Sequence, residues 1–529
     1  MARGFGLASR DTHEGRIAGA ASVVGSATVL SRIAGYVRDA AIAYVFGAGL
    51  AADAFFMAFR ISNLLRRLVG EGALTSSFIP IFTEELGMRS REEARRLLSS
   101  VFTLFTLILA ALTVLGMVFS KEIVWLMSPG FLSDPVKFDL TVSLTRLMFP
   151  YMLFVGLMAL AMGALNSVKH FIAPAISPLF FNIIIILAVL TLTPFLQIPV
   201  YALGIGVLIG GFFQFVLQLP YLRRYGLSPS PLFLFKDKAI WKIFLLMGPA
   251  AFGVGVYQLN IFVTLWFSSQ LAEGSVSYLY YAGRLMELPL GVFGVAISTA
   301  ALPSLSEHAA KKEWDGFRES LSFALRIVNF VTIPATAGLI ILSYPVIDVL
   351  FKRGSFNDAA LSGTAIALYY YAIGLVPVAV SRILSSVFYS LKDTATPVYV
   401  ALVSFVVNAV LCFALIGPLG HGGLALATSL SSAVNAVLLL VVLRKRFGRF
   451  DGSGILSSAL KSSVASLLMM GTIFLLIRFL YSEPLGLVWK ALILALTLVS
   501  GIVIYITFAR IFKSSEVLFL KNYIKRKRS

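Results

Sequence analysis

The sequence predicts an all-α polytopic membrane protein with about 14 transmembrane helices, arranged as two parallel six-helix lobes plus two extra C-terminal helices. Three observations support this class. Of the 529 residues, 58% are hydrophobic and only 13% are charged, whereas soluble domains are about a quarter charged. The apolar residues form continuous runs long enough to cross roughly 30 Å of hydrocarbon, rather than alternating as in a β-barrel. Similar segments also recur in two parts of the chain.

Apolar runs separated by loop-forming residues predict the spans in chain order. The first, second, eighth and tenth runs are long, which predicts bent or tilted helices. The expected spans lie near residues 16–45, 51–82, 98–119, 138–166, 171–194, 200–222, 240–267, 275–305, 319–342, 361–391, 396–416, 422–443, 457–480 and 487–511.

The distribution of basic residues predicts how these spans are oriented. An even number of spans places both termini on one side, together with the Lys- and Arg-rich loops and the tail KNYIKRKRS. The positive-inside rule makes that side cytoplasmic. The net charge of +19 is then mainly a topology signal, with affinity for anionic membrane lipids, and it does not require nucleic-acid binding. The opposite side carries Lys121, Lys137, Lys352 and Arg353.

Two pairs of segments match at nearly the same offset. MAFRISNLL resembles YAGRLMELP and aligns Arg60 with Arg284, while SVKHFIAP resembles SLKDTATP and aligns Lys169 with Lys392. A repeat of six spans makes the two copies parallel, and parallel repeats place a substrate site between two lobes. We expect an N-terminal lobe over residues 1–225, a C-terminal lobe over 226–446, and a helix pair with a basic tail over 447–529.

The second span carries charges along one helical face, at steps of three and four residues over roughly 27 Å. The first and eighth spans carry further charges. A charge at the bilayer centre costs roughly 2.5–3.5 kcal/mol on insertion scales, so we expect these side chains to line a hydrated cavity. The candidate substrate-binding residues are Arg32, Arg38, Asp39, Asp53, Arg60, Arg66, Arg67, Glu71 and Arg284.

Structural alternatives remain open for the acidic members of this set. Asp39 and Glu71 fit internal salt bridges equally well, and Asp53 fits a helix cap. The surplus of arginine favours phosphate or pyrophosphate over a cationic drug. No nucleophile, metal-ligating cluster or phosphate loop is present, so we expect a transporter rather than an enzyme, with no metal and no cofactor. Asn182 is expected to form an interhelical hydrogen bond.

The stretch SRIAGYVRDAAIAYVFGAGLAADAFFMAFRISNLLRRLVGEGALTSSFIPIF resembles the first two helices of the MurJ (MviN) family of lipid II flippases, in the MOP exporter superfamily. YYAGRLMELPLGVFGVAISTAALPSLS resembles that family's eighth helix. The resemblance implies transport of lipid II, the undecaprenyl-pyrophosphate-linked disaccharide-pentapeptide of peptidoglycan and cell wall biogenesis. Transport would run by alternating access from the inner to the outer leaflet of the bacterial cytoplasmic (inner) membrane. The resemblance also places the family's cavity arginines on Arg38, Arg66 and Arg284, and cavity acids on Asp39 and Asp53.

The resemblance leaves the driving force open. Some members are described with a sodium site that uses carboxylates in the seventh and eleventh spans, whereas GVYQLNIFVTLWF and VYVALVSFVVNAVLCFAL contain no acidic residue. Asn408 and Thr428 offer oxygens, but a sodium ion there would lack charge compensation. Coupling to the membrane potential or to protons stays open, as does association with cell-wall synthesis proteins. The alternatives are a flippase for another polyprenyl-pyrophosphate-linked glycan, of O-antigen or capsule type, and, less favoured, a cation-coupled drug exporter.

Overall fold

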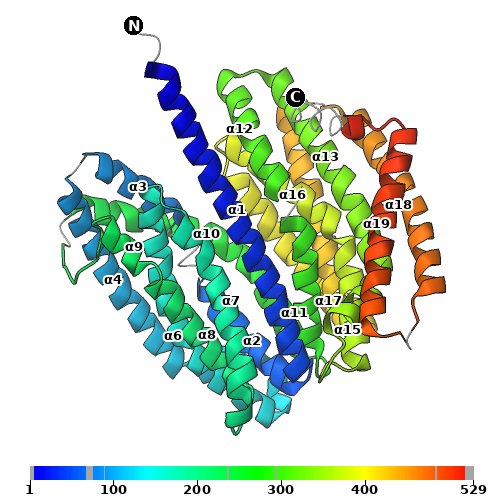
Figure 1. Cartoon of the computed structure of the whole chain (residues 1–529), viewed down its shortest axis with the longest axis horizontal. Coiled ribbons are helices and arrows are strands. Elements are labelled where there is room, and N and C mark those ends of the chain that lie inside the picture. Colours follow the sequence, from blue (N-terminus) through cyan, green and yellow to red (C-terminus); the bar gives the residue numbers. More distant parts are fainter. Residues whose placement is uncertain are drawn as a thin grey trace. The chain divides into compact units, whose positions relative to one another are not determined.

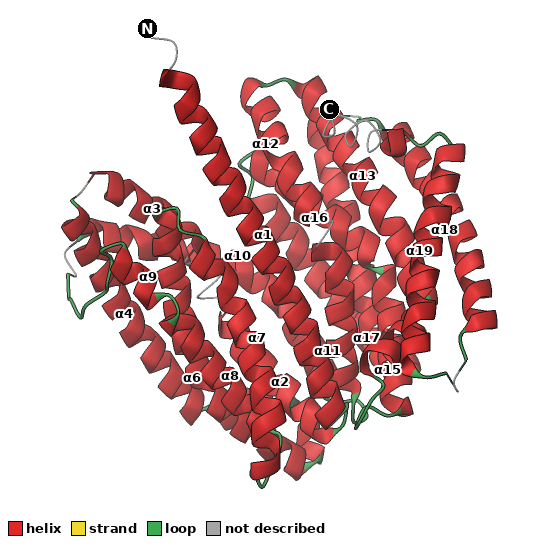
Figure 2. Ribbon diagram, in the orientation of Figure 1, coloured by secondary structure: helices red, strands yellow, loops and turns green. Residues whose placement is uncertain are grey.

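The computed structural model describes residues 5–66, 75–88, 90–234, 237–291, 295–448, 450–482 and 485–518. Within these ranges the regular structure is helical, with short turns and 3₁₀ segments between the α-helices and no strand (Figures 1 and 2). The all-α class predicted from the sequence is therefore confirmed.

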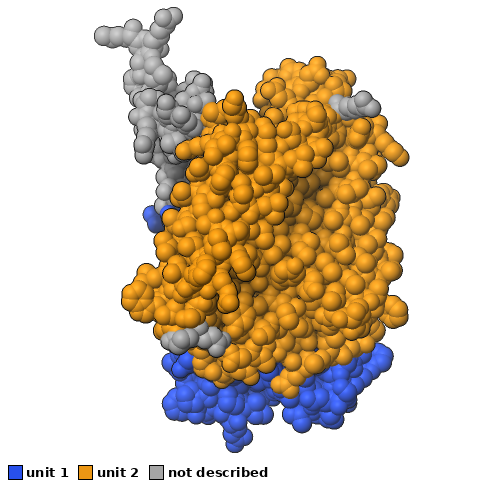
Figure 3. Space-filling view, turned by 90° about the vertical axis from the view of Figure 1, so that its right-hand side faces the viewer, with its two compact units in different colours: residues 1–258 blue, residues 259–529 orange. Residues whose placement is uncertain are grey.

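The helices form two compact units, residues 1–258 and 259–529 (Figure 3). The division falls inside α10 (Lys238–Ser268), and the domain limits drawn from the sequence stay a prediction. The first unit also contains α1 (Phe5–Phe46), α2 (Leu50–Arg66), α3 (Thr75–Met88), α4 (Arg91–Val118), α5 (Ser120–Met127), α6 (Pro135–Ser167), α7 (Ile172–Leu192), α8 (Tyr201–Val216) and α9 (Leu219–Arg224). The second contains α11 (Ser275–Pro289), α12 (Val295–Lys311), α13 (Trp314–Ile341), α14 (Ser343–Phe351), α15 (Asp358–Ile373), α16 (Leu375–Ser390), α17 (Ala395–Phe447), α18 (Gly452–Leu480) and α19 (Leu487–Ile511).

In the first unit, α6 lies at the centre of the packing. Asp134 caps its N-terminus by accepting a hydrogen bond from the backbone N–H of Lys137 at 3.1 Å, and Pro135 follows in the first turn. Helices α2, α4 and α8 pack around it, and 72% of its most apolar stretch is buried, against 33% for α4. Gly156 allows α4 to approach closely, because a Cβ there would lie 2.4 Å from Leu109 Cδ1.

In the second unit, α13 packs against α12, α16 and α18, and α19 packs against α18. Phe330, Met469, Ile473 and Tyr505 belong to one apolar cluster that joins α13, α18 and α19. The Tyr505 hydroxyl donates to the Phe330 backbone oxygen at 2.6 Å, which satisfies its polar end inside the cluster. The last two helices are therefore packed into the second unit by ordinary core contacts.

A buried charge cluster also ties these last two helices to α14. Asp348 Oδ2 accepts hydrogen bonds from Lys490 Nζ at 2.8 Å and from the Tyr481 hydroxyl at 2.5 Å. The side chains of Asp348 and Lys490 are 5% and 11% exposed. Removing one partner of such a pair would leave an uncompensated charge away from water, so the cluster fixes the α18–α19 connection against α14.

Helix α17 bends at Gly420, whose φ of 55° and ψ of −133° are not helical. A positive φ is accessible to glycine because it lacks a Cβ. The bend lies between the predicted spans 396–416 and 422–443, so α17 consists of two helices separated by a kink at Gly420.

Among the described residues, eight helices are long and apolar enough to cross a membrane, and a bent pair formed by α15 and α16 makes nine. α17 counts once in that number although it contains two predicted spans. The predicted span over 51–82 is divided into α2 and α3, and the residues between them are not described. The count of fourteen spans stays a prediction.

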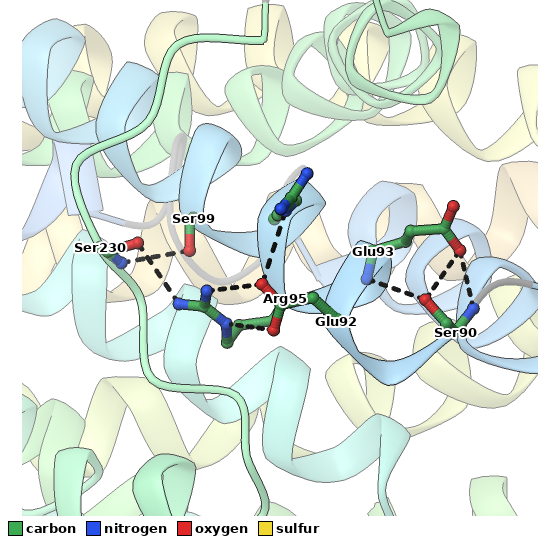
Figure 4. Close-up of polar contacts among 7 residues, drawn as sticks. Ser90, Glu92, Glu93, Arg95, Ser99 and Ser230 are labelled. Carbon is green, nitrogen blue, oxygen red and sulfur yellow. Dashed lines mark hydrogen bonds and ion pairs between the residues drawn. The ribbon is translucent and has the colours of Figure 1, made fainter.

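The segment after α9, residues 227–234, forms a strap that passes across α4 (Figure 4). Three alternate backbone N–H groups of the strap donate to hydroxyl oxygens of α4: Ser230 to Ser99 at 3.1 Å, Leu232 to Thr103 at 3.0 Å and Leu234 to Ser100 at 2.9 Å. Pro229 and Pro231 occupy intervening positions, where proline's missing N–H leaves no donor to satisfy. The strap is thus held on α4 through its main chain.

Candidate functional site

The candidate residues fall on three helices. Arg32, Arg38 and Asp39 lie on α1, Asp53 and Arg60 on α2, and Arg284 on α11 of the second unit. Arg66 is the last residue of α2, but its side chain lies outside the described residues, as do Arg67 and Glu71 altogether. The structure therefore locates the α1 and α2 members in one unit and Arg284 in the other.

Arg38 lies in a buried polar network between α1 and α7. Its Nε and Nη2 donate to Asp39 Oδ1 at 3.0 and 2.7 Å, and its Nη1 donates to Asn182 Oδ1 at 3.0 Å. The Arg38 and Asp39 side chains are 8% and 0% exposed. The Asn182 amide donates in turn to the Ser31 backbone oxygen at 3.0 Å, so the predicted interhelical hydrogen bond of Asn182 is confirmed. A guanidinium held in this way orders the α1–α7 contact.

Asp53 forms a second buried ion pair. It lies in the first turn of α2, and its Oδ2 accepts from Lys137 Nζ at 2.7 Å, with side-chain exposures of 1% and 7%. The Lys137 ammonium also lies 4.3 Å from the centre of the Phe131 ring, a cation–π contact. Sequence reasoning placed Lys137 among the loop lysines and missed this role. No spacing rule relates two residues 84 positions apart, so the sequence held no signal for the pair.

Three of the candidate arginines are more accessible. Arg32 is exposed and Arg60 is half-buried. The Arg284 side chain is 31% exposed, and its Nη1 lies 3.1 Å from Glu287 Oε2, which is 56% exposed. Solvent weakens an exposed pair of this kind, so the contact with Glu287 contributes little to holding the Arg284 guanidinium. Arg32, Arg60 and Arg284 are thus more accessible to a ligand than Arg38 is.

The described side chains of α1 and α2 carry more positive than negative charge. Arg38 forms an ion pair with Asp39, and Asp53 forms one with Lys137 on α6. Arg32 and Arg60 lie on the same two helices as Arg38, Asp39 and Asp53. Arginine thus outnumbers aspartate among the described side chains of α1 and α2, and such a surplus suits an anionic ligand.

The two side chains considered for a sodium ion form hydrogen bonds within the protein. Asn408 Oδ1 accepts from Ser431 Oγ at 3.4 Å, and the Thr428 hydroxyl donates to the Leu424 backbone oxygen at 3.0 Å. Among the described residues, no group of three His, Cys, Asp or Glu side chains could hold a metal ion. The geometry therefore gives no cation a carboxylate cage in this part of the chain.

The comparisons with known proteins decide the family. A sequence profile described as "Lipid II flippase MurJ" matches residues 42–507. The chain belongs to the MurJ family. Among the curated relatives, a probable lipid II flippase MurJ from Vibrio cholerae is 37% identical over 424 residues, covering 79% of this chain and 81% of the relative. The lipid II flippase MurJ from Burkholderia cenocepacia is 36% identical over 423 residues, covering 79% and 82%.

Solved structures agree with this assignment. A lipid II flippase MurJ in an inward closed conformation superposes with a TM-score of 0.78 at 30% identity, covering 92% of this chain and 98% of that one. An inward-facing multidrug resistance transporter of the MATE family, from the MOP superfamily, superposes with a TM-score of 0.65 at 14% identity, covering 78% and 94%. The second likeness shows the shared fold alone. The MurJ family resemblance of the sequence is thereby confirmed.

Proposed function

We propose that this chain is a lipid II flippase of the bacterial cytoplasmic membrane, a transporter rather than an enzyme. The observation that carries the proposal is the match to the MurJ family over residues 42–507, joined with a MurJ structure of the same fold over 98% of its length. The substrate named by these relatives is an anionic lipid, and the accessible arginines of α1, α2 and α11 supply the complementary charge.

The proposed binding set is led by Arg32, Arg60 and Arg284. Arg32 is exposed, Arg60 is half-buried and the Arg284 side chain is 31% exposed. Guanidinium groups form forked hydrogen bonds with phosphate and pyrophosphate. Arg38 is assigned a supporting part, because its bonds to Asp39 and Asn182 order α1 against α7. Arg66, Arg67 and Glu71 remain members of the set on sequence grounds.

The proposed transport mechanism is alternating access. In the proposed orientation, both termini of the chain lie in the cytoplasm. The distribution of lysine and arginine among the predicted loops supports this orientation. Binding of the pyrophosphate would neutralise the arginine surplus. A ligand that binds one conformation more tightly than the other shifts the equilibrium between the two conformations. We assign no residue to coupling with the membrane potential or with protons.

The test is complementation of a bacterium depleted of its own lipid II flippase, with lipid II in the outer leaflet quantified. We expect the wild type to rescue growth, and Arg60→Ala and Arg284→Ala to reduce outer-leaflet lipid II at least tenfold at normal protein levels. Failure of a well-expressed wild type would favour the flippase for another polyprenyl-pyrophosphate-linked glycan.

Arg95→Ala is the matched control for Arg284→Ala. Arg95 forms an exposed pair with Glu92 three residues away, 2.7 Å from Nη2 to Oε1 (Figure 4). Its side chain is 31% exposed and that of Glu92 55%, values close to those of Arg284 and Glu287. Because Arg95 is outside the proposed binding set, its variant should rescue fully. If Arg95→Ala and Arg284→Ala lost rescue equally, the effect of Arg284 would be one of general surface charge.

A further inference from the structure

Four residues adopt a backbone conformation that their side chains disfavour. Among the described residues, the only non-glycine positions with positive φ are Lys169 at 60°, Lys312 at 58°, Lys392 at 59° and Lys513 at 51°. The left-handed region brings Cβ close to the following carbonyl oxygen, and among non-glycine residues it is Asn, Asp and His that are enriched there. Four lysines at such positions need a reason beyond local geometry.

All four lysines close a helix by the same motif. The lysine N–H bonds to the carbonyl three residues back, at 2.9 to 3.2 Å, and the next residue's N–H bonds to the carbonyl five residues before it, at 2.9 Å in every case. This is the Schellman arrangement, in which glycine is the usual residue at the left-handed position. The motif terminates α6, α12, α16 and α19.

Gly226 shows that the chain also uses glycine in the same turn. It has a φ of 67° after α9, its N–H bonds to Arg223 at 3.0 Å, and the Leu227 N–H bonds to Leu222 at 2.8 Å. The glycine turn and the lysine turns have the same hydrogen-bond pattern and differ in the charge of the residue at the left-handed position. The motif itself therefore does not require a lysine, and glycine would form it with less strain.

In the second unit, the three lysine turns lie at one end of the helices. Trp314, just after the Lys312 turn, packs against Phe447 in a tilted ring contact, at 5.1 Å between ring centres. The neighbouring Arg446 pairs with Asp393, the residue after Lys392. Helix α18 begins five residues beyond Phe447, and its Ser458 donates at 3.0 Å to Glu516, three residues after Lys513. These contacts connect all three turns.

In the first unit, the Lys169 turn lies against the Gly226 turn. The ring of His170 stacks on Tyr221 at 4.8 Å between ring centres and lies 5.4 Å from Tyr225. All four lysines are exposed, and none forms an ion pair with another described residue. Each lysine thus ends a helix at the end of its unit with its ammonium available.

We propose that Lys169, Lys312, Lys392 and Lys513 are headgroup contacts for anionic phospholipids, held at the point where each helix leaves the bilayer. The inference rests on the proposed orientation, in which these helix ends meet the cytoplasmic leaflet. A lysine in the last helical turn also interacts favourably with the helix dipole. A lysine placed one residue earlier would make the same interaction without backbone strain. The left-handed position places the charge beyond the helix end, beside the negatively charged headgroups.

The experiment uses the purified full-length chain in a neutral detergent. The unfolding temperature is measured before and after adding phosphatidylglycerol or phosphatidylcholine. One variant combines Lys169→Gly, Lys312→Gly, Lys392→Gly and Lys513→Gly, and its matched control carries arginine at the same four positions. A third variant, Gly226→Lys, adds a lysine to the turn that lacks one, where a Cβ would meet nothing closer than 3.6 Å.

We expect the four-glycine variant to unfold at a higher temperature than the wild type without lipid, because the strained turns are relieved. It should lose more than half of the rise that phosphatidylglycerol gives the wild type, whereas the four-arginine variant keeps that rise. Gly226→Lys should lower the lipid-free unfolding temperature and enlarge the rise with phosphatidylglycerol. Added salt should shrink the wild-type rise, because the contacts are exposed.

Equal rises in the wild type and the four-glycine variant would overturn the proposal. So would a rise with inorganic pyrophosphate as large as that with phosphatidylglycerol, which would indicate a site for a free anion. The function is tested separately by complementation. A wild type that fails to rescue but shows the phosphatidylglycerol rise, lost in the four-glycine variant, would contradict the proposed substrate and support the lipid contacts.

Discussion

The buried pair between Asp53 and Lys137 allows a quantitative test of what the charges on α2 do. Replacing Lys137 with methionine keeps an unbranched chain but removes the ammonium 2.7 Å from the Asp53 carboxylate. At an effective dielectric constant near 20, that separation corresponds to about 6 kcal/mol of Coulomb attraction before desolvation is counted. Breaking one side of a buried pair costs about 3–5 kcal/mol, and with exposures of 1% and 7% we expect about 4 kcal/mol here.

The double variant Asp53→Asn with Lys137→Met supplies the comparison. It removes both charges together, so no carboxylate is left buried beside a missing partner, and we expect its stability to return to within about 1–2 kcal/mol of the wild type. The wild type, Asp53→Asn, Lys137→Met and the double variant would each be unfolded by denaturant in neutral detergent. Together these four proteins form a double-mutant cycle. A Lys137→Met protein within about 1 kcal/mol of the wild type would refute the reasoning.

The same variants separate structure from transport. If the double variant folds like the wild type and rescues flippase-depleted cells, the charge of Asp53 serves the packing of α2 on α6 and not the substrate. If it folds but fails to rescue, Asp53 belongs to the binding set expected from the sequence. The protein level in the membrane is the control that makes the two results comparable.

Three further predictions concern other parts of the fold. Tyr481→Phe removes a hydroxyl bonded to the buried Asp348 carboxylate at 2.5 Å and should cost about 2 kcal/mol, measured by denaturant unfolding. Gly423→Ala should destabilise by about 1–3 kcal/mol, because its Cβ would lie 2.2 Å from a backbone oxygen. Gly417→Ala, whose Cβ meets nothing within 4 Å, should be neutral or stabilising in the same assay. Burial, and then the charge of a nearby arginine, lower the pKa of His170, which lies outside the spans. Its protonation therefore favours unfolding, so stability should fall as pH drops from about 6.5 through the lowered pKa, and His170→Gln should flatten that slope in unfolding temperature.

The helices that the sequence located well are those that read as uninterrupted apolar runs. The predicted spans 171–194, 457–480 and 487–511 correspond to α7 (Ile172–Leu192), α18 (Gly452–Leu480) and α19 (Leu487–Ile511). Length and hydropathy suffice there because lipid-facing positions impose no other pattern. The predicted span over 51–82 contains α2 and α3, and its continuity stays a prediction because residues 67–74 are not described.

The candidate site was less predictable than the helices. A stripe of charge can be read along one helix, because helical periodicity relates residues three and four apart. The partners of those charges came from other helices: Asn182 on α7 binds Arg38, and Lys137 on α6 binds Asp53. The neighbouring Asp39 was anticipated as a salt-bridge partner because it is adjacent in the chain, and it does pair with Arg38. Contacts between helices depend on packing, which a single sequence does not encode in any fixed spacing.

The strap over α4 has an evolutionary consequence. Its three hydrogen bonds use main-chain N–H groups as donors and the hydroxyls of Ser99, Ser100 and Thr103 as acceptors. Substitutions within the strap leave those donors in place, unless they introduce proline at a donor position, whereas loss of a hydroxyl on α4 leaves a main-chain group unsatisfied. Loops usually vary more freely than the helices they cross. In this case the helix should retain its small hydroxyl residues so that the loop can change its side chains while keeping its length.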